Sequence, residues 1–336
     1  MAVIPLSYIC VFEVIDMARE TIVVFGGAGF IGGHLLRRLL EEEATLICAD
    51  IREPSERLPG VQYVLADVRD LSGFRVDQPV SKIYNLAAVH TTPGHEPWEY
   101  YDTNVRGAVE ITKFADQAGC SNITFTSSIS VYGPDETAKD ESTKPTPNSD
   151  YGHSKLIAES VHLTWLDKNA SGQLVIVRPA VVFGKGEGGN FTRLARMLEK
   201  GFFFYPGRKD TIKSCIFVGD LIEWILEAER VNQKKTVLNG AYTNRYTIEE
   251  IVETFREVAF PKARAFLVPA EVLKIVATAL RPLSIVGLGI HPDRVNKLMV
   301  STNILPSWAE ERGLATKDRL KIALTEWKAS TDGRFF

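Results

Sequence analysis

The sequence predicts an α/β fold, a doubly wound parallel sheet with a smaller mixed α/β lobe on its C-terminal side. Three observations predict it. Short apolar runs rich in β-branched residues alternate with longer amphipathic segments between Thr21 and Pro179, as expected for a parallel sheet that helices cover on both faces. A glycine-rich turn follows the first of these runs. After Pro179 the alternation loosens, which marks the start of a different kind of unit.

The alternation assigns the elements of the larger domain in order. Each short apolar run has the length of a buried strand, and each longer segment has the period of a helix. In the helix expected at 97–118, Val105, Ala108, Ile111 and Ala115 recur at helical spacing and predict a stripe that faces the core. We expect strands at 21–25, 45–50, 61–67, 82–88, 122–128 and 174–179, with helices at 30–42, 97–118 and 151–168.

The segment after Pro179 predicts a smaller lobe set over the carboxyl edge of the sheet. Thr247 followed by Glu250 forms a capping box, which marks the start of a helix at 246–258. The other elements expected there are a glycine-rich loop at 184–190, a helix at 217–229, a strand at 236–241 and a helix at 317–328.

The N-terminal stretch stands apart from both units. The apolar run 2–12 is too short to span a bilayer core of about 30 Å and lacks the basic region of a signal peptide. The run that begins at Met17 has the character of a domain start. We therefore expect an N-terminal extension at 1–16, the larger domain at 17–180, and a substrate-binding lobe at 181–330 that interleaves with it.

Composition excludes several functional classes. The net charge of −3 and the pI near 6.1 give no basic surface for nucleic acid. The four cysteines are far apart and form no CxxC pair, which favours a reducing, cytoplasmic setting over a disulfide framework. The six histidines show no ligand spacing, so we expect no metal.

The glycine-rich turn predicts a dinucleotide site. Gly26, Gly29 and Gly32 lie between a strand and a helix, where glycine permits a tight turn and lets the helix N-terminus approach a pyrophosphate. Asp50 ends the second strand, at the position from which a carboxylate binds both hydroxyls of an adenosine ribose. That carboxylate would repel a 2′-phosphate, so NAD is favoured over NADP, although the nearby Arg52 leaves NADP open.

Two further patterns point to chemistry. Tyr151 and Lys155 in "YGHSK" lie one helical turn apart on the same face. A phenol with its ordinary pKa of about 10 needs nearby positive charge to act as a base at neutral pH, and a lysine ammonium together with an oxidised nicotinamide supplies it. The serine-rich strand end "SSISVYG" at 127–133 would place a hydroxyl within hydrogen-bonding reach of the substrate oxygen that Tyr151 contacts. Asp67, after the third strand, is placed either to meet an adenine or to form a turn.

In this combination and order, the chain resembles the extended short-chain dehydrogenase/reductase family over residues 21 to about 327. The motifs that carry the resemblance include "GGAGFIG", "NLAAVH", "YYDTNVRGAVEI", "SSISVYG", "YGHSK" and "VRPAVVFG". The resemblance implies a Rossmann domain that binds NAD, with Tyr151 as the acid/base, Lys155 as ribose ligand and field source, and Ser128 as the orienting hydroxyl. Tyr132 then lines the pocket as a turn residue. The implied cofactor-binding residues are Gly26, Gly29, Phe30, Ile31, Gly32, Asp50, Asp67, Val68, Ala87, Asn104, Tyr151 and Lys155.

The strand end also narrows the reaction. Members of the family that remove water from a nucleotide sugar carry Thr-Asp-Glu before "VYG", whereas this chain has Ser128, Ile129 and Ser130 there. Without either carboxylate, a 4,6-dehydratase is disfavoured. The resemblance leaves an NAD-dependent epimerase at C4 of a nucleotide-linked or polyprenyl-diphosphate-linked sugar in surface polysaccharide biosynthesis, a reductase of a 4-keto nucleotide sugar, or a 3-beta-hydroxysteroid-type dehydrogenase. A cofactor-sensing regulator is disfavoured, because it would not need Tyr151 and Lys155.

The resemblance also implies substrate contacts and partners. Asn190 and Lys213 fall where nucleotide-sugar enzymes of the family approach the diphosphate; the alternatives are a helix cap and a solvated lysine. The apolar segment 268–290 either rests on the inner face of the cell membrane near the substrate mouth or is a buried helix of the small lobe. The helices at 97–118 and 151–168 are those through which the family often forms a homodimer.

Overall fold

Seven parallel strands form the central sheet of the computed structural model, which describes residues 19–91, 94–272, 299–315 and 317–335. The strand order is β11-β7-β5-β4-β1-β2-β3, and every pairing is parallel. The doubly wound parallel sheet predicted from the sequence is confirmed. Its strands are β1 (Glu20–Phe25), β2 (Ala44–Asp50), β3 (Val61–Leu65), β4 (Val80–Asn85), β5 (Asn122–Thr126), β7 (Gln173–Pro179) and β11 (Lys235–Gly240).

The strand order reverses around β1, which lies between β2 and β4. From β1 the chain first builds outward through β2 and β3, and then crosses to the other side to add β4, β5 and β7. Ligands of open α/β sheets bind outside the carboxyl ends of the strands at such a reversal. The glycine-rich turn follows β1 directly, so it lies at this point of the sheet.

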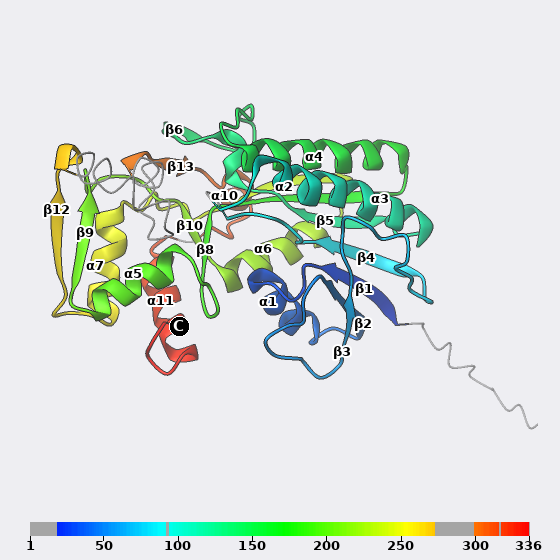
Figure 1. The fold of residues 1–336 in the computed structure, drawn as a ribbon, viewed down its shortest axis with the longest axis horizontal. Helices are drawn as coiled ribbons and strands as arrows, with labels where there is room; N and C mark the ends of the chain where they lie inside the picture. Colours follow the sequence, from blue (N-terminus) through cyan, green and yellow to red (C-terminus); the bar gives the residue numbers. More distant parts are fainter. Residues whose placement is uncertain (1–18, 92–93, 273–298, 316, 336) are drawn as a thin grey trace, which may run out of the picture.

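Helices cover both faces of the sheet (Figure 1). Because successive residues of a strand point to opposite sides, each face has its own core. Ile22 of β1 lies in a core shared with two helices on one face, whereas the next residue, Val23, lies in a separate core on the other face. The first face carries α1 (Phe30–Leu39) and α6 (Val218–Arg230), and the second carries α3 (Gly107–Gln117) and α4 (Asp150–Lys168).

The helix expected at 97–118 contains a short π-helical segment, η1 (Tyr101–Arg106), between α2 (Pro97–Tyr100) and α3. A π-helical turn holds more residues than an α-helical turn, so it rotates the residues before it relative to those after it. The expected core positions of Ala108, Ile111 and Ala115 are confirmed. The expectation for Val105 is wrong: it is half-buried outside both cores, and its neighbour Asn104 is buried instead, at 3% exposure.

The chain after residue 180 contributes to both the sheet and the smaller lobe. The strand expected at 236–241 is β11, which is part of the large sheet, and the helix expected at 217–229 is α6, which packs on one face of that sheet. The capping box of Thr247 and Glu250 is confirmed at the start of α7. The remaining elements are η2 (Ile129–Tyr132), β6 (Asp135–Lys139), β8 (Val181–Phe183), α5 (Asn190–Glu199), β9 (Phe202–Pro206), β10 (Cys215–Phe217), α7 (Ile248–Val258), β12 (Arg264–Val268), β13 (Thr302–Ile304), α10 (Ser307–Glu310) and α11 (Arg319–Ser330).

Two stretches singled out in the sequence fall largely outside this description. The N-terminal extension 1–16 lies outside the described residues, as does the apolar segment 268–290 beyond residue 272. Neither the extension nor the membrane contact expected of the segment is tested by the fold.

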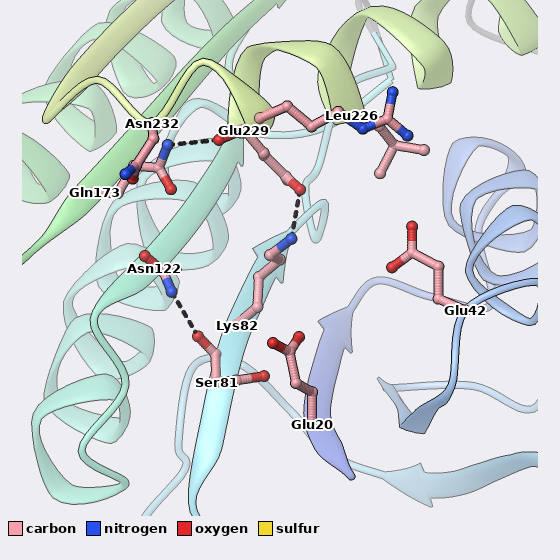
Figure 2. Close-up of a pocket in the computed structure, with 10 residues that line it drawn as sticks. Glu20, Glu42, Ser81, Lys82, Asn122, Gln173, Leu226, Glu229 and Asn232 are labelled. Carbon is pink, nitrogen blue, oxygen red and sulfur yellow. Dashed lines mark hydrogen bonds and ion pairs between the residues drawn. The ribbon is translucent and has the colours of Figure 1, made fainter. Parts of the chain in front are cut away.

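A small polar pocket of about 330 Å³ lies at the amino-terminal edge of the sheet (Figure 2). Its central group is Glu229 of α6, whose side chain is 8% exposed. One carboxylate oxygen accepts hydrogen bonds from Lys82 Nζ at 2.6 Å and from the Tyr84 hydroxyl at 2.9 Å, and the other accepts one from the Thr124 hydroxyl at 2.6 Å. Glu229 therefore ties α6 to β4 and β5 at the edge opposite the glycine-rich turn.

Replacing Glu229 with alanine is expected to lower the free energy of unfolding by roughly 3 kcal/mol, because it leaves a lysine and two hydroxyls without their shared acceptor. Urea unfolding followed by circular dichroism measures the change. Glu227→Ala, which removes a more exposed carboxylate from the same helix, is the control and is expected to change stability by less than about 0.5 kcal/mol. Equal stability of the two variants would contradict the anchoring role of Glu229.

Candidate active site

The glycine-rich turn brings backbone groups too close together for any side chain. Gly26 has a φ of +80°, and a Cβ on it would lie 2.6 Å from the backbone nitrogen of Ala87, just after β4. A Cβ on Gly32 would lie 2.5 Å from the carbonyl oxygen of Gly26. Gly29 is the N-cap of α1, with no side-chain hydrogen bond to the helix end. The first-turn N–H groups of α1 are therefore left available to an anionic ligand.

Asp50 joins this turn to the end of β2. Its Oδ2 accepts a hydrogen bond from the backbone nitrogen of Ala28 at 3.0 Å, and its Oδ1 accepts one from that of Arg52 at 3.2 Å. The side chain is buried at the floor of the cavity that the turn borders. Each carboxylate oxygen retains a second lone pair, so the residue is equipped to accept from ribose hydroxyls.

One large cavity of about 2170 Å³ unites the two parts of the expected site. It runs from the glycine-rich turn, past the end of β5, to the small lobe. Its size leaves room for a dinucleotide together with a second ligand. The residues predicted from the sequence that line it are Gly26, Gly29, Phe30, Ile31, Gly32, Asp50, Asp67, Val68, Ala87, Ser128, Tyr151, Lys155, Asn190 and Lys213.

Asn104 is the predicted cofactor residue that does not line this cavity. Its side chain accepts a hydrogen bond from the Val89 backbone nitrogen and donates to the Val89 carbonyl, both at 3.0 Å. It also donates to the Ser154 hydroxyl at 2.9 Å. Asn104 thus links the chain after β4 to α4. The π-helical segment sets the position of Asn104, and the hydrophobic pattern of the sequence did not predict that segment.

Asp67 lines the cavity but is held by its own neighbour. Its Oδ1 accepts a hydrogen bond from the Arg69 backbone nitrogen at 2.9 Å, and its carboxylate pairs with the Arg69 guanidinium at 2.6 Å. This hydrogen-bonded ion pair lowers the pKa of Asp67. The turn-forming role is therefore confirmed, while a contact with adenine stays a prediction.

The three expected catalytic side chains meet where β5 ends against α4. Ser128 is the N-cap of η2, and its hydroxyl accepts from the Ser130 backbone nitrogen at 3.1 Å. Tyr151 lies half-buried in the first turn of α4. Lys155, one turn later, is 1% exposed and donates from Nζ to the Thr126 carbonyl at 2.7 Å. The geometry brings a hydroxyl, a phenol and an amine together at one wall of the cavity.

Burial disfavours the charged forms of both Tyr151 and Lys155, although a tyrosine that acts as a base must become a phenolate. It raises the pKa of Tyr151 to about 12, although a hydrogen bond with Ser128 acts in the opposite direction. Burial also lowers the pKa of Lys155 to about 7, and the carboxylate of Glu159 partly offsets this. The phenol is therefore protonated at neutral pH in this structure. Positive charge from an oxidised nicotinamide and from Lys155 would favour the phenolate.

Tyr132 does not line the cavity, contrary to the expectation from its motif. The side chain is fully buried, and its hydroxyl donates to Asn239 and accepts from Arg178. The turn η2 separates the two roles: its first end presents Ser128 to the cavity, and its last residue anchors the turn in the core. The sequence motif places both residues but not the direction in which each one points.

The two substrate candidates lie on the small-lobe side of the cavity, and neither alternative reading of them holds. Lys213 is not a solvated lysine: its Nζ donates to the Val300 carbonyl at 2.7 Å, and burial lowers its pKa to about 8. Asn190 is not the cap of α5, whose N-cap is Gly189. The buried carboxylate of Glu187 accepts from the Thr192 backbone nitrogen of that helix at 2.9 Å instead.

Gly152 is a residue of the site that the sequence analysis missed. A Cβ on it would lie 2.5 Å from the carbonyl oxygen of Ser130. The first turn of α4 therefore touches the backbone of η2, which brings Tyr151 to Ser128. A glycine in the first turn of an otherwise well-formed helix was the available signal, because glycine is costly there unless a close approach requires it.

A comparison with known families finds a match over residues 22–240 to the family described as "NAD dependent epimerase/dehydratase family". The matched stretch covers the central sheet and every catalytic candidate. The chain belongs to this family. It is accordingly an enzyme that uses NAD, as the glycine-rich turn and Asp50 predict. The interpretation drawn from the sequence motifs is confirmed at the level of the family.

Curated relatives in the NAD dependent epimerase/dehydratase family include two sugar 4-epimerases. The N-acetyl-alpha-D-glucosaminyl-diphospho-ditrans,octacis-undecaprenol 4-epimerase of Escherichia coli O157:H7 is 31% identical over 211 residues, which are 62% of this chain and 62% of that protein. The UDP-glucose 4-epimerase of Lactobacillus helveticus is 28% identical over 268 residues, 70% of this chain and 81% of that one. The match thus spans less than two thirds of the E. coli relative.

Solved structures of the family share the fold. The UDP-Glc/GlcNAc 4-epimerase from Campylobacter jejuni superposes with a TM-score of 0.71 over 93% of this chain and 99% of that one, at 19% identity. At this identity the likeness shows the fold alone.

Replacing Tyr151 with phenylalanine is expected to reduce turnover at least 100-fold while leaving bound NAD unchanged, because general acid–base groups contribute roughly 10²- to 10⁴-fold. Steady-state kinetics and the NAD content of the purified protein measure both effects. The matched control is Tyr101→Phe. It removes a hydroxyl that donates to Asp150, the residue before Tyr151 in the first turn of α4. Residual turnover above roughly a tenth would rule out the acid/base role of Tyr151.

Proposed function

We propose that the protein is an NAD-dependent epimerase acting at C4 of a sugar carried on a diphosphate, either nucleotide-linked or polyprenyl-linked, in surface polysaccharide biosynthesis. The observation that carries the proposal is the single cavity that runs from the glycine-rich turn, past Tyr151, to Lys213. The same cavity is lined by the glycine-rich turn for the cofactor, by Ser128 and Tyr151 for the sugar hydroxyl, and by the half-buried Lys213, which would bind a diphosphate. The two relatives named above act on sugars of these two kinds.

The residues at the end of β5 support hydride chemistry over elimination. Ile129 and Ser130 stand in η2 where a dehydratase would need an acid and a base. The phenol of Tyr151 exchanges the C4 hydroxyl proton, and Ser128 orients the same oxygen. When bound, NAD supplies the acceptor and later the donor of the C4 hydride. Rotation of the keto sugar between the two transfers inverts C4.

A reductase of a 4-keto sugar is the second candidate, because it would use the second half of the same chemistry. Arg52 favours it: the residue lines the cavity beside Asp50 and is exposed, so its guanidinium is available to a 2′-phosphate. A reductase exchanges its cofactor at every turnover, whereas an epimerase retains it.

The test is whether the purified protein carries NAD through gel filtration and turns over a sugar with no cofactor added. UDP-N-acetylglucosamine and undecaprenyl-diphosphate-linked N-acetylglucosamine are the two substrates to compare, with a sterol as the third arm. We expect retained NAD and a C4-inverted product from one of the sugars. Conversion of a sugar into its 4-keto form, with added NAD or NADP reduced in equal amount, would identify a reductase running in reverse. Activity on the sterol alone would overturn both proposals.

An exposed apolar surface near the cavity supports contact with a membrane. Phe204 both lines the cavity and is 46% exposed, and it lies against Phe266, which is 47% exposed. Phe202 extends this aromatic surface along β9, with its ring centroid 5.5 Å from that of Phe204. No helix among the described residues is long and apolar enough to cross a membrane. We propose that this surface rests on the inner face of the cell membrane, where a lipid-linked sugar would be reached.

Phe266→Asp is expected to reduce co-sedimentation with anionic liposomes severalfold, because a charged side chain would have to enter the lipid interface. The control is Ile322→Asp, which adds the same charge at an exposed apolar residue of α11. Equal binding of the two variants and the wild type would contradict the membrane proposal.

The homodimer stays a prediction. The exposed Ile157 of α4 lies where a partner helix would pack. We expect light scattering to give the mass of a dimer for the wild type and of a monomer for Ile157→Asp.

A further inference from the structure

Arg178, at the end of β7, is a buried cation that does not line the catalytic cavity. Its guanidinium makes three hydrogen bonds in two directions. Nε and Nη2 donate to the two carboxylate oxygens of Glu159, at 2.9 and 2.7 Å, and Nη1 donates to the Tyr132 hydroxyl at 2.7 Å. One planar group thus holds two different elements of the fold.

The first of these elements is the turn that presents Ser128. Tyr132 is the last residue of η2, and Ser128 is its N-cap. The carbonyl of Tyr132 accepts hydrogen bonds from Lys139 Nζ and from the Thr146 hydroxyl, both at 3.0 Å. Its ring also lies under the Arg178 guanidinium, 5.0 Å from ring centroid to Cζ. The turn is therefore fixed at the end opposite its catalytic serine.

The second element is the helix that presents Tyr151 and Lys155. Glu159 lies on α4 one turn beyond Lys155 and two turns beyond Tyr151, on the same helix face, and it is 2% exposed. The pair with Arg178 fixes α4 at this point. At the other end of the contact, Gly152 touches the backbone of η2. Helix and turn are therefore held together on both sides of the reacting groups.

We propose that Arg178 is a positioning residue for hydride transfer, which sets the separation of the Ser128 hydroxyl from the Tyr151 phenol by binding η2 and α4 at once. The inference rests on the catalytic roles in the proposed function. Such a separation matters because a displacement of about 1 Å can cost roughly 100-fold in rate. A lysine at this position keeps the charge but cannot form a two-point contact with Glu159 and still reach Tyr132.

The experiment compares Arg178→Lys and Tyr132→Phe with the wild type, each as NAD-loaded full-length protein. We expect kcat to fall about 100-fold in Arg178→Lys and about tenfold in Tyr132→Phe, with KM and NAD content unchanged. The double variant is expected to lose no more than Arg178→Lys alone, because both changes break one linkage. Tyr84→Phe is the matched control: it removes a hydroxyl from an equally buried tyrosine at the opposite edge of the sheet and is expected to keep its kcat.

Crystal structures of the same proteins supply a readout that does not depend on the substrate. The distance from the Ser128 hydroxyl to the Tyr151 phenol is expected to change in Tyr132→Phe and to stay unchanged in Tyr84→Phe. An unchanged distance in Tyr132→Phe, or a kcat no lower than that of Tyr84→Phe, would overturn the inference. Absence of turnover in the wild type would instead count against the proposed function, while the distance would still decide the role of Arg178. If Arg178→Lys does not fold, Tyr132→Phe alone decides.

Discussion

The site depends on how closely backbone can approach backbone at the carboxyl edge of the sheet. Gly26 lies against the backbone of Ala87, Gly32 lies against Gly26, and Gly152 lies against Ser130. The first two contacts shape the dinucleotide end of the cavity, and the third brings the catalytic helix onto the catalytic turn. A single methyl group at any of them would force strands, helix and turn apart, so the chemistry follows from the absence of side chains at three positions.

An oxidised nicotinamide would bring further positive charge to the catalytic groups of the site. Lys155 is buried and donates to the Thr126 carbonyl, and Tyr151 is half-buried as a neutral phenol. Burial keeps the phenol protonated, and positive charge beside it would favour the phenolate that proton exchange requires. The charged pairs of Arg178 with Glu159 and of Glu229 with Lys82 do not line the cavity, and they hold elements of the fold in place.

The sequence predicted what depends on local pattern. The parallel sheet and the glycine-rich turn follow from short motifs and periodicity, and the fold and the family confirm them. Asp50, Tyr151 and Lys155 line the cavity as the motifs indicate, and their roles stay predictions. The positions of Asn104 and Val105 did not follow, because a π-helical segment within a regular pattern leaves no mark in hydrophobic spacing. Tyr132 was placed in the right region with the wrong surroundings, because elements distant in the sequence decide whether a polar side-chain end meets the cavity or the core. Lys213 lines the cavity as expected, and the alternative of a solvated lysine failed for the same reason.

The seventh strand has a consequence for how the protein forms. β7 pairs with β5 on one side and with β11 on the other, and β11 follows only after the chain has formed β8, α5, β9 and β10 outside the large sheet and then α6 on its face. During synthesis β7 therefore remains an unpaired sheet edge until residue 240 has emerged from the ribosome and β11 can pair with it. An exposed edge of this kind is a place where chains pair with one another. The small lobe and the sheet are consequently bound in a single folding unit, and a fragment that ends near residue 180 would keep the cofactor turn but carry a self-associating edge.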